Sequence, residues 1–125
     1  GNPYGHIVLR GGKAGTNYHL EAVTNIATEL ENANMTSKVM VDCSHGNSNK
    51  DYRKQSNVLD SVITQIKHGS QNIMGVMIES HIQAGNQKLV DDHSKLVYGK
   101  SITDACIDFE TTSMLLEKLS EAVQI

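Results

Sequence analysis

Three short clusters of polar residues carry the side-chain types that bind phosphate groups and metal ions. The first is Arg10-Gly11-Gly12-Lys13, the second covers residues 42–47, and the third covers residues 79–81. A guanidinium beside glycines that let backbone N–H groups approach suits an oxyanion. The other two clusters offer imidazole and carboxylate groups, which suit a divalent transition metal. Together the clusters indicate a site for a phosphate and a metal ion.

The candidate metal ligands come from separate segments of the chain. They form one set of imidazoles and carboxylates: Asp42, His45, Glu79, His81 and Asp104. An ion with an open coordination position would act on a carbonyl group as a Lewis acid. No short ligand motif such as H-E-x-x-H supports this interpretation, so ordinary loop and surface roles of these side chains remain the alternative.

The glycine cluster also has two interpretations. It contains neither the P-loop pattern nor the dinucleotide-binding fingerprint. Charged residues in a solvated turn after a strand are common. Anion binding by Arg10 and Lys13 is therefore one hypothesis, and a plain turn is the other.

Several reactive or metal-binding residue types are expected to have structural roles only. Cys43 lies two residues from His45 and could be a nucleophile, but a small buried residue under the loop is the more frequent case, also for Cys106. Two cysteines do not indicate a disulfide framework. The remaining histidines are expected at the surface or at helix ends: His6, His19, His68 and His93. Four methionines in apolar runs are expected in the core: Met40, Met74, Met77 and Met114.

The elements that position these residues can be predicted from the apolar pattern. Runs rich in β-branched residues predict strands over 6–10, 38–42 and 73–78. Each run is nearly continuous rather than alternating, which is typical of parallel strands buried on both faces. In each case a polar cluster follows directly.

Helices are predicted between and after the strands. Apolar residues recur three and four apart over 17–33, 57–67 and 111–123. Their ends are indicated by Asn34, Gly69 and, as a helix N-cap, Asp108. The stretch from Gln83 to Ile107 is polar and without sustained period, and loops of that length are usually functional or disordered.

This order predicts one α/β domain over residues 1–125. The strands are expected to be parallel, in sequential order, and joined by right-handed crossovers. Parallel sheets and barrels bind ligands at the carboxyl ends of their strands. The three polar clusters are therefore expected at one edge.

Charge and hydropathy argue against two classes of partner. Eleven Lys and Arg against fourteen Asp and Glu give a net charge of -3, which does not favour nucleic acid. The longest apolar runs are far below the roughly 20 residues of a membrane span. The first residues show no signal peptide, so a cytoplasmic location is expected.

Four segments closely resemble one enzyme family over essentially the whole chain. They are residues 6–13, 41–50, 75–81 and 98–106. These segments are similar to the C-terminal part of 3-deoxy-D-arabino-heptulosonate 7-phosphate (DAHP) synthases of the type common in enteric bacteria and yeasts. The resemblance implies a (β/α)8 TIM barrel, of which this chain would be the βαβαβα C-terminal portion.

The resemblance also implies an activity, which is condensation of phosphoenolpyruvate with erythrose 4-phosphate at the entry to the shikimate pathway. It implies that His45, Glu79 and Asp104 hold a divalent Mn, Fe, Co or Zn ion. Arg10 would bind the phosphate of phosphoenolpyruvate, and Lys13 and His45 would be catalytic. Asp42 and His81 would have supporting roles.

The chain also departs from the family pattern. A whole barrel takes about 250 residues. The family's metal-binding cysteine, its Lys-Pro-Arg-Thr-like segment and its regulatory N-terminal part have no counterpart here, and neither Cys43 nor Cys106 replaces that cysteine. A fragment that is inactive alone is expected. The alternatives are a self-standing phosphate-binding module and a non-catalytic assembly element, because exposed strand edges invite pairing, and a homo-oligomer is expected in any case.

Overall fold

Three short parallel strands form the centre of the fold. The structure is a computed structural model that describes residues 1–123. Strands β1 (Ile7–Leu9), β2 (Val39–Asp42) and β3 (Ile73–Met77) lie in the order β1-β2-β3. Both pairs are parallel, with a register shift between Val39 and Met40. The predicted parallel, sequential sheet is confirmed.

Three helices accompany the strands: α1 (Leu20–Asn32), α2 (Gln55–Lys67) and α3 (Phe109–Val123). The predicted helix starts were off by two or three residues. Helix α1 begins later than predicted because Asn17 is engaged in the preceding loop, where its backbone N–H donates to Asn47 and its side chain accepts from Gly11. Helix α2 begins earlier because a 3-10 turn (Tyr52–Lys54), capped by Asp51, leads into it.

The predicted helix-end signals are confirmed. Asn34 and Gly69 have φ values of 55° and 91°, the left-handed conformation that ends a helix. Asp108 caps α3, because its Oδ1 accepts a hydrogen bond from the Thr111 N–H at 2.8 Å. This bond holds the pKa of the Asp108 carboxyl below its usual value.

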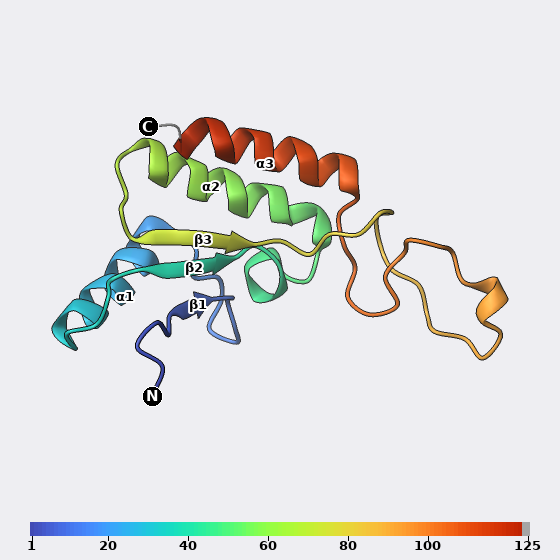
Figure 1. The fold of residues 1–125 in the computed structure, drawn as a ribbon, viewed down its shortest axis with the longest axis horizontal. Coiled ribbons are helices and arrows are strands. Elements are labelled where there is room, and N and C mark those ends of the chain that lie inside the picture. The colour runs from blue at the N-terminus through green and yellow to red at the C-terminus, as the bar shows by residue number, and fades with distance from the viewer. Residues whose placement is uncertain (124–125) are drawn as a thin grey trace.

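One hydrophobic core joins the sheet to the helices. Helices α2 and α3 lie side by side along the sheet (Figure 1). The buried core side chains come from β1, β2 and all three helices, and include Leu9, Val23, Leu30, Val39, Val41, Val58, Leu59, Val62 and Leu115; Ile73 and Val76 of β3 pack against them partly buried. Burying each such side chain contributes about 1.5–3 kcal/mol. The carboxyl ends of the strands are thereby fixed in one row.

The prediction that the strands are buried on both faces is wrong for β1 and β3. Val8 and Met74 are 44% and 52% exposed. Met114 on α3 is 52% exposed as well, while Met40 and Met77 are half-buried. A continuous apolar run predicts that both faces of a strand are covered. Within residues 1–123, the helices cover the face of the sheet that carries the core, and side chains on the other face, such as Val8 and Met74, are exposed.

The long polar segment after β3 is an ordered loop that projects from the sheet (Figure 1). It contains one 3-10 turn (His93–Lys95). The Gln87 side chain holds its two limbs together, since Nε2 donates to the carbonyls of Val97 and Lys100 and Oε1 accepts from the Val97 N–H, each at 2.8 Å. None of the helices within residues 1–123 has the length and apolar character that crossing a membrane requires.

Candidate metal and phosphate site

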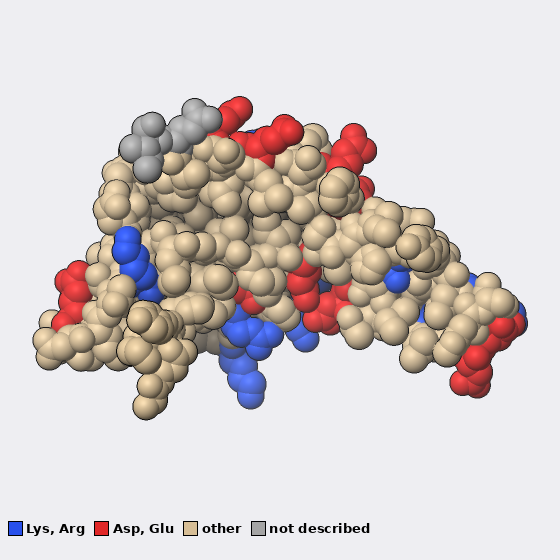
Figure 2. Space-filling view, viewed as in Figure 1, with Lys and Arg blue, Asp and Glu red and all other residues tan. Residues whose placement is uncertain are grey.

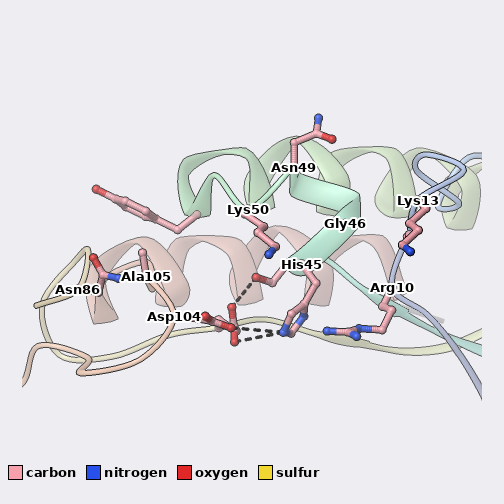
Figure 3. Close-up of a pocket in the computed structure, with 14 residues that line it drawn as sticks. Arg10, Lys13, His45, Gly46, Asn49, Lys50, Asn86, Asp104 and Ala105 are labelled. Carbon is pink, nitrogen blue, oxygen red and sulfur yellow. Dashed lines mark hydrogen bonds and ion pairs between the residues drawn. The ribbon is translucent and has the colours of Figure 1, made fainter. Parts of the chain in front are cut away.

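The polar clusters meet at the carboxyl ends of the strands. Arg10 follows β1, His45 follows β2 and Glu79 follows β3. A single parallel bridge between Ser80 and Ile107 adds the end of the long loop to this row, which brings Asp104 beside the others. They surround a cavity of about 800 Å³, called here the strand-end pocket (Figure 3). Its lining includes the charged residues Arg10, Lys13, Lys50, Glu79 and Asp104 and the imidazole of His45.

Three of the predicted metal ligands face one another in this pocket. His45 Nε2 lies 3.6 Å from Glu79 Oε1 and 3.6 Å from Asp104 Oδ2. All three donor atoms lie within 4.8 Å of one another. Metal–nitrogen and metal–oxygen bonds of about 2.0–2.2 Å fit between donors at this spacing. One imidazole and two carboxylates also match the ligand types that divalent transition metals take, so the residues present fit such an ion.

The orientation of the His45 ring is set by a buried carboxylate. Asp42 is almost fully buried, and its Oδ2 lies 2.8 Å from His45 Nδ1. Its Oδ1 accepts a hydrogen bond from the Ser44 N–H at 2.8 Å. Because the Asp42 carboxylate pairs with Nδ1, Nε2 is the ring nitrogen that faces Glu79 and Asp104 and is the one placed to bind a metal ion. His45 also has a φ of 45°, a strained backbone conformation of the kind that clusters at functional sites.

The Glu79 carboxylate is held by a hydroxyl group. Ser44 Oγ donates to Glu79 Oε2 at 2.5 Å, which leaves Oε1 facing His45. Asp104 is different, since its side chain is 70% exposed. Two of the three donors are therefore pre-positioned by hydrogen bonds, and the third, Asp104, is exposed to solvent.

Cationic side chains lie beside the acidic ones. In Figure 3, Arg10 lies beside the His45 ring, Lys50 lies above it, and Lys13 lies beyond Arg10. Figure 2 shows a group of Lys and Arg side chains next to acidic side chains near the middle of the face in view. This arrangement depends on close contact between the backbones of the loops that follow β1 and β2. A Cβ on Gly46 would lie 2.6 Å from the Gly11 carbonyl carbon, so both glycines are required where the loops after β1 and β2 touch.

The structure does not bring every candidate into the donor group. His81 is exposed, and its Nδ1 accepts a hydrogen bond from the Ile82 N–H. Asp42 contacts His45 rather than facing the pocket as a donor. Sequence reasoning missed Ser44 and Lys50 as pocket residues. Both lie in segment 41–50, one of the four segments that resemble the family. That resemblance is the signal that could have identified them as pocket residues.

Asn47 was also missed, although it joins the loops that form the pocket. It is buried, and its Nδ2 donates to the carbonyls of Leu9 and Asp42 at 3.0 and 2.9 Å. Its Oδ1 accepts from the Asn17 N–H at 2.8 Å. One side chain thus ties the end of β1, the end of β2 and the loop before α1.

We expect Asn47→Ala to lower the free energy of unfolding by about 3 kcal/mol, because each buried partner left without its hydrogen bond costs about 1–3 kcal/mol. Urea unfolding followed by circular dichroism measures the change. Asn57→Ala, at an exposed position of α2, is the control and should have little effect. An unfolding midpoint of Asn47→Ala equal to that of the wild type would contradict the role given to this side chain.

The interpretation of the cysteines as buried packing residues is confirmed. Cys43 and Cys106 are both free and buried. Burial, with the Asp42 charge as a second cause, raises the pKa of the Cys43 thiol to about 12. Burial also raises the pKa of Cys106. Neither thiol is placed or ionised as a nucleophile at neutral pH.

We therefore expect iodoacetamide to leave Cys43 unmodified in the folded protein at pH 8, where a pKa of about 12 leaves about one thiolate in ten thousand molecules. Mass spectrometry after alkylation, with and without urea, measures this. Alkylation should follow unfolding. Rapid alkylation of Cys43 in the folded state would restore the nucleophile hypothesis.

The fold and the site define an α/β protein with a parallel sheet and a polar centre at the carboxyl ends of its strands. Residues 1–117 match the family model described as the DAHP synthetase I family. The chain belongs to this family of enzymes.

Individual relatives agree with this assignment. The Tyr-sensitive phospho-2-dehydro-3-deoxyheptonate aldolase of Salmonella typhimurium is 52% identical over 119 residues, which is 95% of this chain and 33% of that protein. A putative phospho-2-dehydro-3-deoxyheptonate aldolase of Schizosaccharomyces pombe is 45% identical over 125 residues, 99% of this chain and 34% of that protein.

A solved structure gives the same result for the fold. The phospho-2-dehydro-3-deoxyheptonate aldolase of Francisella tularensis matches with a TM-score of 0.94 and 52% identity, over 99% of this chain and 36% of that one. The predicted fold class, a βαβαβα portion of an α/β barrel enzyme, is confirmed. The chain spans about a third of the length of these relatives.

Proposed function

We propose that this chain supplies the metal site and part of the phosphoenolpyruvate site of a DAHP synthase. The activity belongs to the extended protein, meaning a polypeptide of the relatives' length in which these residues form the C-terminal part of the barrel domain. The observation that carries the proposal is the convergence of His45, Glu79 and Asp104 in a pocket that Arg10 and Lys13 also line. A homo-oligomer and a cytoplasmic location stay predictions.

His45, Glu79 and Asp104 are proposed to hold the divalent ion. When bound, such an ion supplies Lewis acidity that polarises the aldehyde oxygen of erythrose 4-phosphate. The chain's own contribution is orientation, because Asp42 fixes the His45 ring and Ser44 fixes the Glu79 carboxylate. The donor set is compatible with Mn, Fe, Co or Zn.

Arg10 and Lys13 are proposed to bind phosphoenolpyruvate at its phosphate end. A guanidinium binds phosphate oxygens in a bidentate manner, and the adjacent Lys13 adds a second positive charge. Held in this way, the methylene carbon of phosphoenolpyruvate can form a bond to the aldehyde carbon of erythrose 4-phosphate. Water adds to the former enol carbon, and one of its protons balances the proton taken up by the former aldehyde oxygen, which becomes a hydroxyl group. The bond between the former enol carbon and the phosphate oxygen then breaks, which leaves a keto group and releases inorganic phosphate. Lys13 and His45 are the side chains of this chain that we propose as catalytic.

Titration of the extended protein with Mn²⁺, followed by calorimetry, tests the metal site. His45→Ala and Glu79→Ala should each weaken binding by about 100-fold or more, since removal of residues that merely support a ligand already costs about 10–100-fold. His93→Ala, an exposed histidine in the long loop, is the matched control and should bind as the wild type does. Equal affinity in all four proteins would contradict the proposed site.

A further inference from the structure

A side chain from helix α2 forms two hydrogen bonds with the backbone of Glu79. Gln55, the first residue of α2, is fully buried. Its Oε1 accepts a hydrogen bond from the Glu79 N–H at 2.8 Å, and its Nε2 donates to the Glu79 carbonyl at 3.0 Å. Both polar groups of this buried amide therefore form hydrogen bonds with the backbone of one residue, Glu79.

These two bonds continue the sheet beyond the point where β2 ends. The last paired residues of β2 and β3 are Asp42 and Met77, and the Cys43 N–H still donates to the Met77 carbonyl at 2.9 Å. After that, the chain from β2 turns into a 3-10 helix at residues 45–48. The amide of Gln55 pairs with the Glu79 backbone at this point, and the Ile107 N–H also donates to the Glu79 carbonyl at 3.0 Å. Gln55 is the side chain that holds both backbone groups of Glu79 at the rim of the strand-end pocket.

We propose that Gln55 is a positioning residue that sets the affinity of the metal site by fixing Glu79 relative to His45. The proposal rests on the function proposed above, because it requires an ion between these two side chains. Val58 and Leu59, in the next turn of α2, are buried in the core, so the amide is anchored to a rigid element. Glu79 is thereby tied to that core through its backbone as well as to Ser44 through its carboxylate.

Helix α2 contains a matched control for this residue. Gln65 is also buried, at 6% exposure, and its Nε2 donates to the Tyr18 carbonyl at 2.8 Å. It does not line the strand-end pocket. Methionine has a similar length without hydrogen-bonding groups, so Gln55→Met and Gln65→Met each remove a buried amide from one helix; the Gln65 amide bonds through Nε2, and its Oε1 has no hydrogen-bond partner within residues 1–123. Gln55→Glu is the second test variant, since it keeps an acceptor for the Glu79 N–H but sets a carboxylate oxygen against the Glu79 carbonyl.

The experiment is calorimetric titration of the extended protein with Mn²⁺, together with thermal unfolding of each variant without metal. Gln55→Met should raise the Kd for Mn²⁺ by about 10–100-fold, the usual effect of removing a group that supports a ligand. Gln55→Glu should shift Kd in the same direction, and it replaces Gln55→Met as the deciding variant if the latter does not fold. Gln65→Met should lower the unfolding temperature and leave Kd unchanged.

The outcomes separate this proposal from the one on which it rests. If the wild type fails to bind Mn²⁺, the metal site and the role of Gln55 are both overturned. If the wild type binds and a folded Gln55 variant has the same Kd, the role of Gln55 alone is overturned. An equal loss of affinity in Gln65→Met would also overturn it, because the effect would then reflect general loosening of α2.

Discussion

Replacing His45 by alanine in the extended protein is expected to lower kcat for DAHP formation by about 1,000-fold or more. His45 contributes the one nitrogen donor of the cluster, 3.6 Å from each carboxylate. The Lewis acidity that depends on this cluster contributes several kcal/mol to transition-state stabilisation. Each 1.36 kcal/mol changes the rate tenfold, so a loss of about 4 kcal/mol gives this factor. Steady-state release of phosphate with saturating Mn²⁺ and both substrates measures the change.

His68→Ala is the control for this prediction. His68 is an exposed histidine at the C-terminal end of α2, and its Nδ1 bonds to the Thr64 carbonyl of its own helix. Its removal should leave kcat unchanged. Asp42→Asn should have an intermediate effect, about 10–100-fold, because the ring of His45 stays present but loses its carboxylate partner. A His45→Ala protein with kcat within about tenfold of the wild type would contradict the proposed metal site.

The strands and their order could be predicted because their signals are local. A run such as Val39-Met40-Val41 is apolar at every position, which predicts a buried strand without knowledge of its neighbours. Once the strands are parallel, the chain direction alone places His45 and Glu79 at the same edge. Their convergence is therefore a consequence of topology rather than of any motif.

The remaining features depend on contacts that the pattern does not encode. Asp104 joins the site because one bridge, Ser80 to Ile107, adds the end of a polar loop to the sheet. Met74 is exposed because burial depends on which layers cover a strand, not on its own residue type. Gln55 and Asn47 resemble solvated polar residues in the sequence. Their burial and backbone partners follow only from the folded chain.

The 125-residue chain by itself is expected to form no measurable DAHP, even with saturating Mn²⁺. It spans about a third of its relatives' length. The condensation needs both phosphorylated substrates held in line beside the metal, and Arg10 and Lys13 are proposed to bind only the phosphate of phosphoenolpyruvate. Loss of orientation alone removes on the order of 7 kcal/mol of barrier reduction. This corresponds to a rate lower by about 100,000-fold, which is below detection.

The assay compares the isolated chain with the extended protein under identical conditions and follows phosphate release that depends on erythrose 4-phosphate. The chain should be assayed over a range of protein concentrations, because exposed strand edges can pair between copies. A site shared between copies would give a rate per chain that rises with concentration. Turnover by the isolated chain at a constant rate per chain, abolished by Arg10→Ala, would contradict the prediction. In that case these residues alone would orient both substrates, and the remaining two-thirds of the relatives' length would serve other purposes than binding erythrose 4-phosphate.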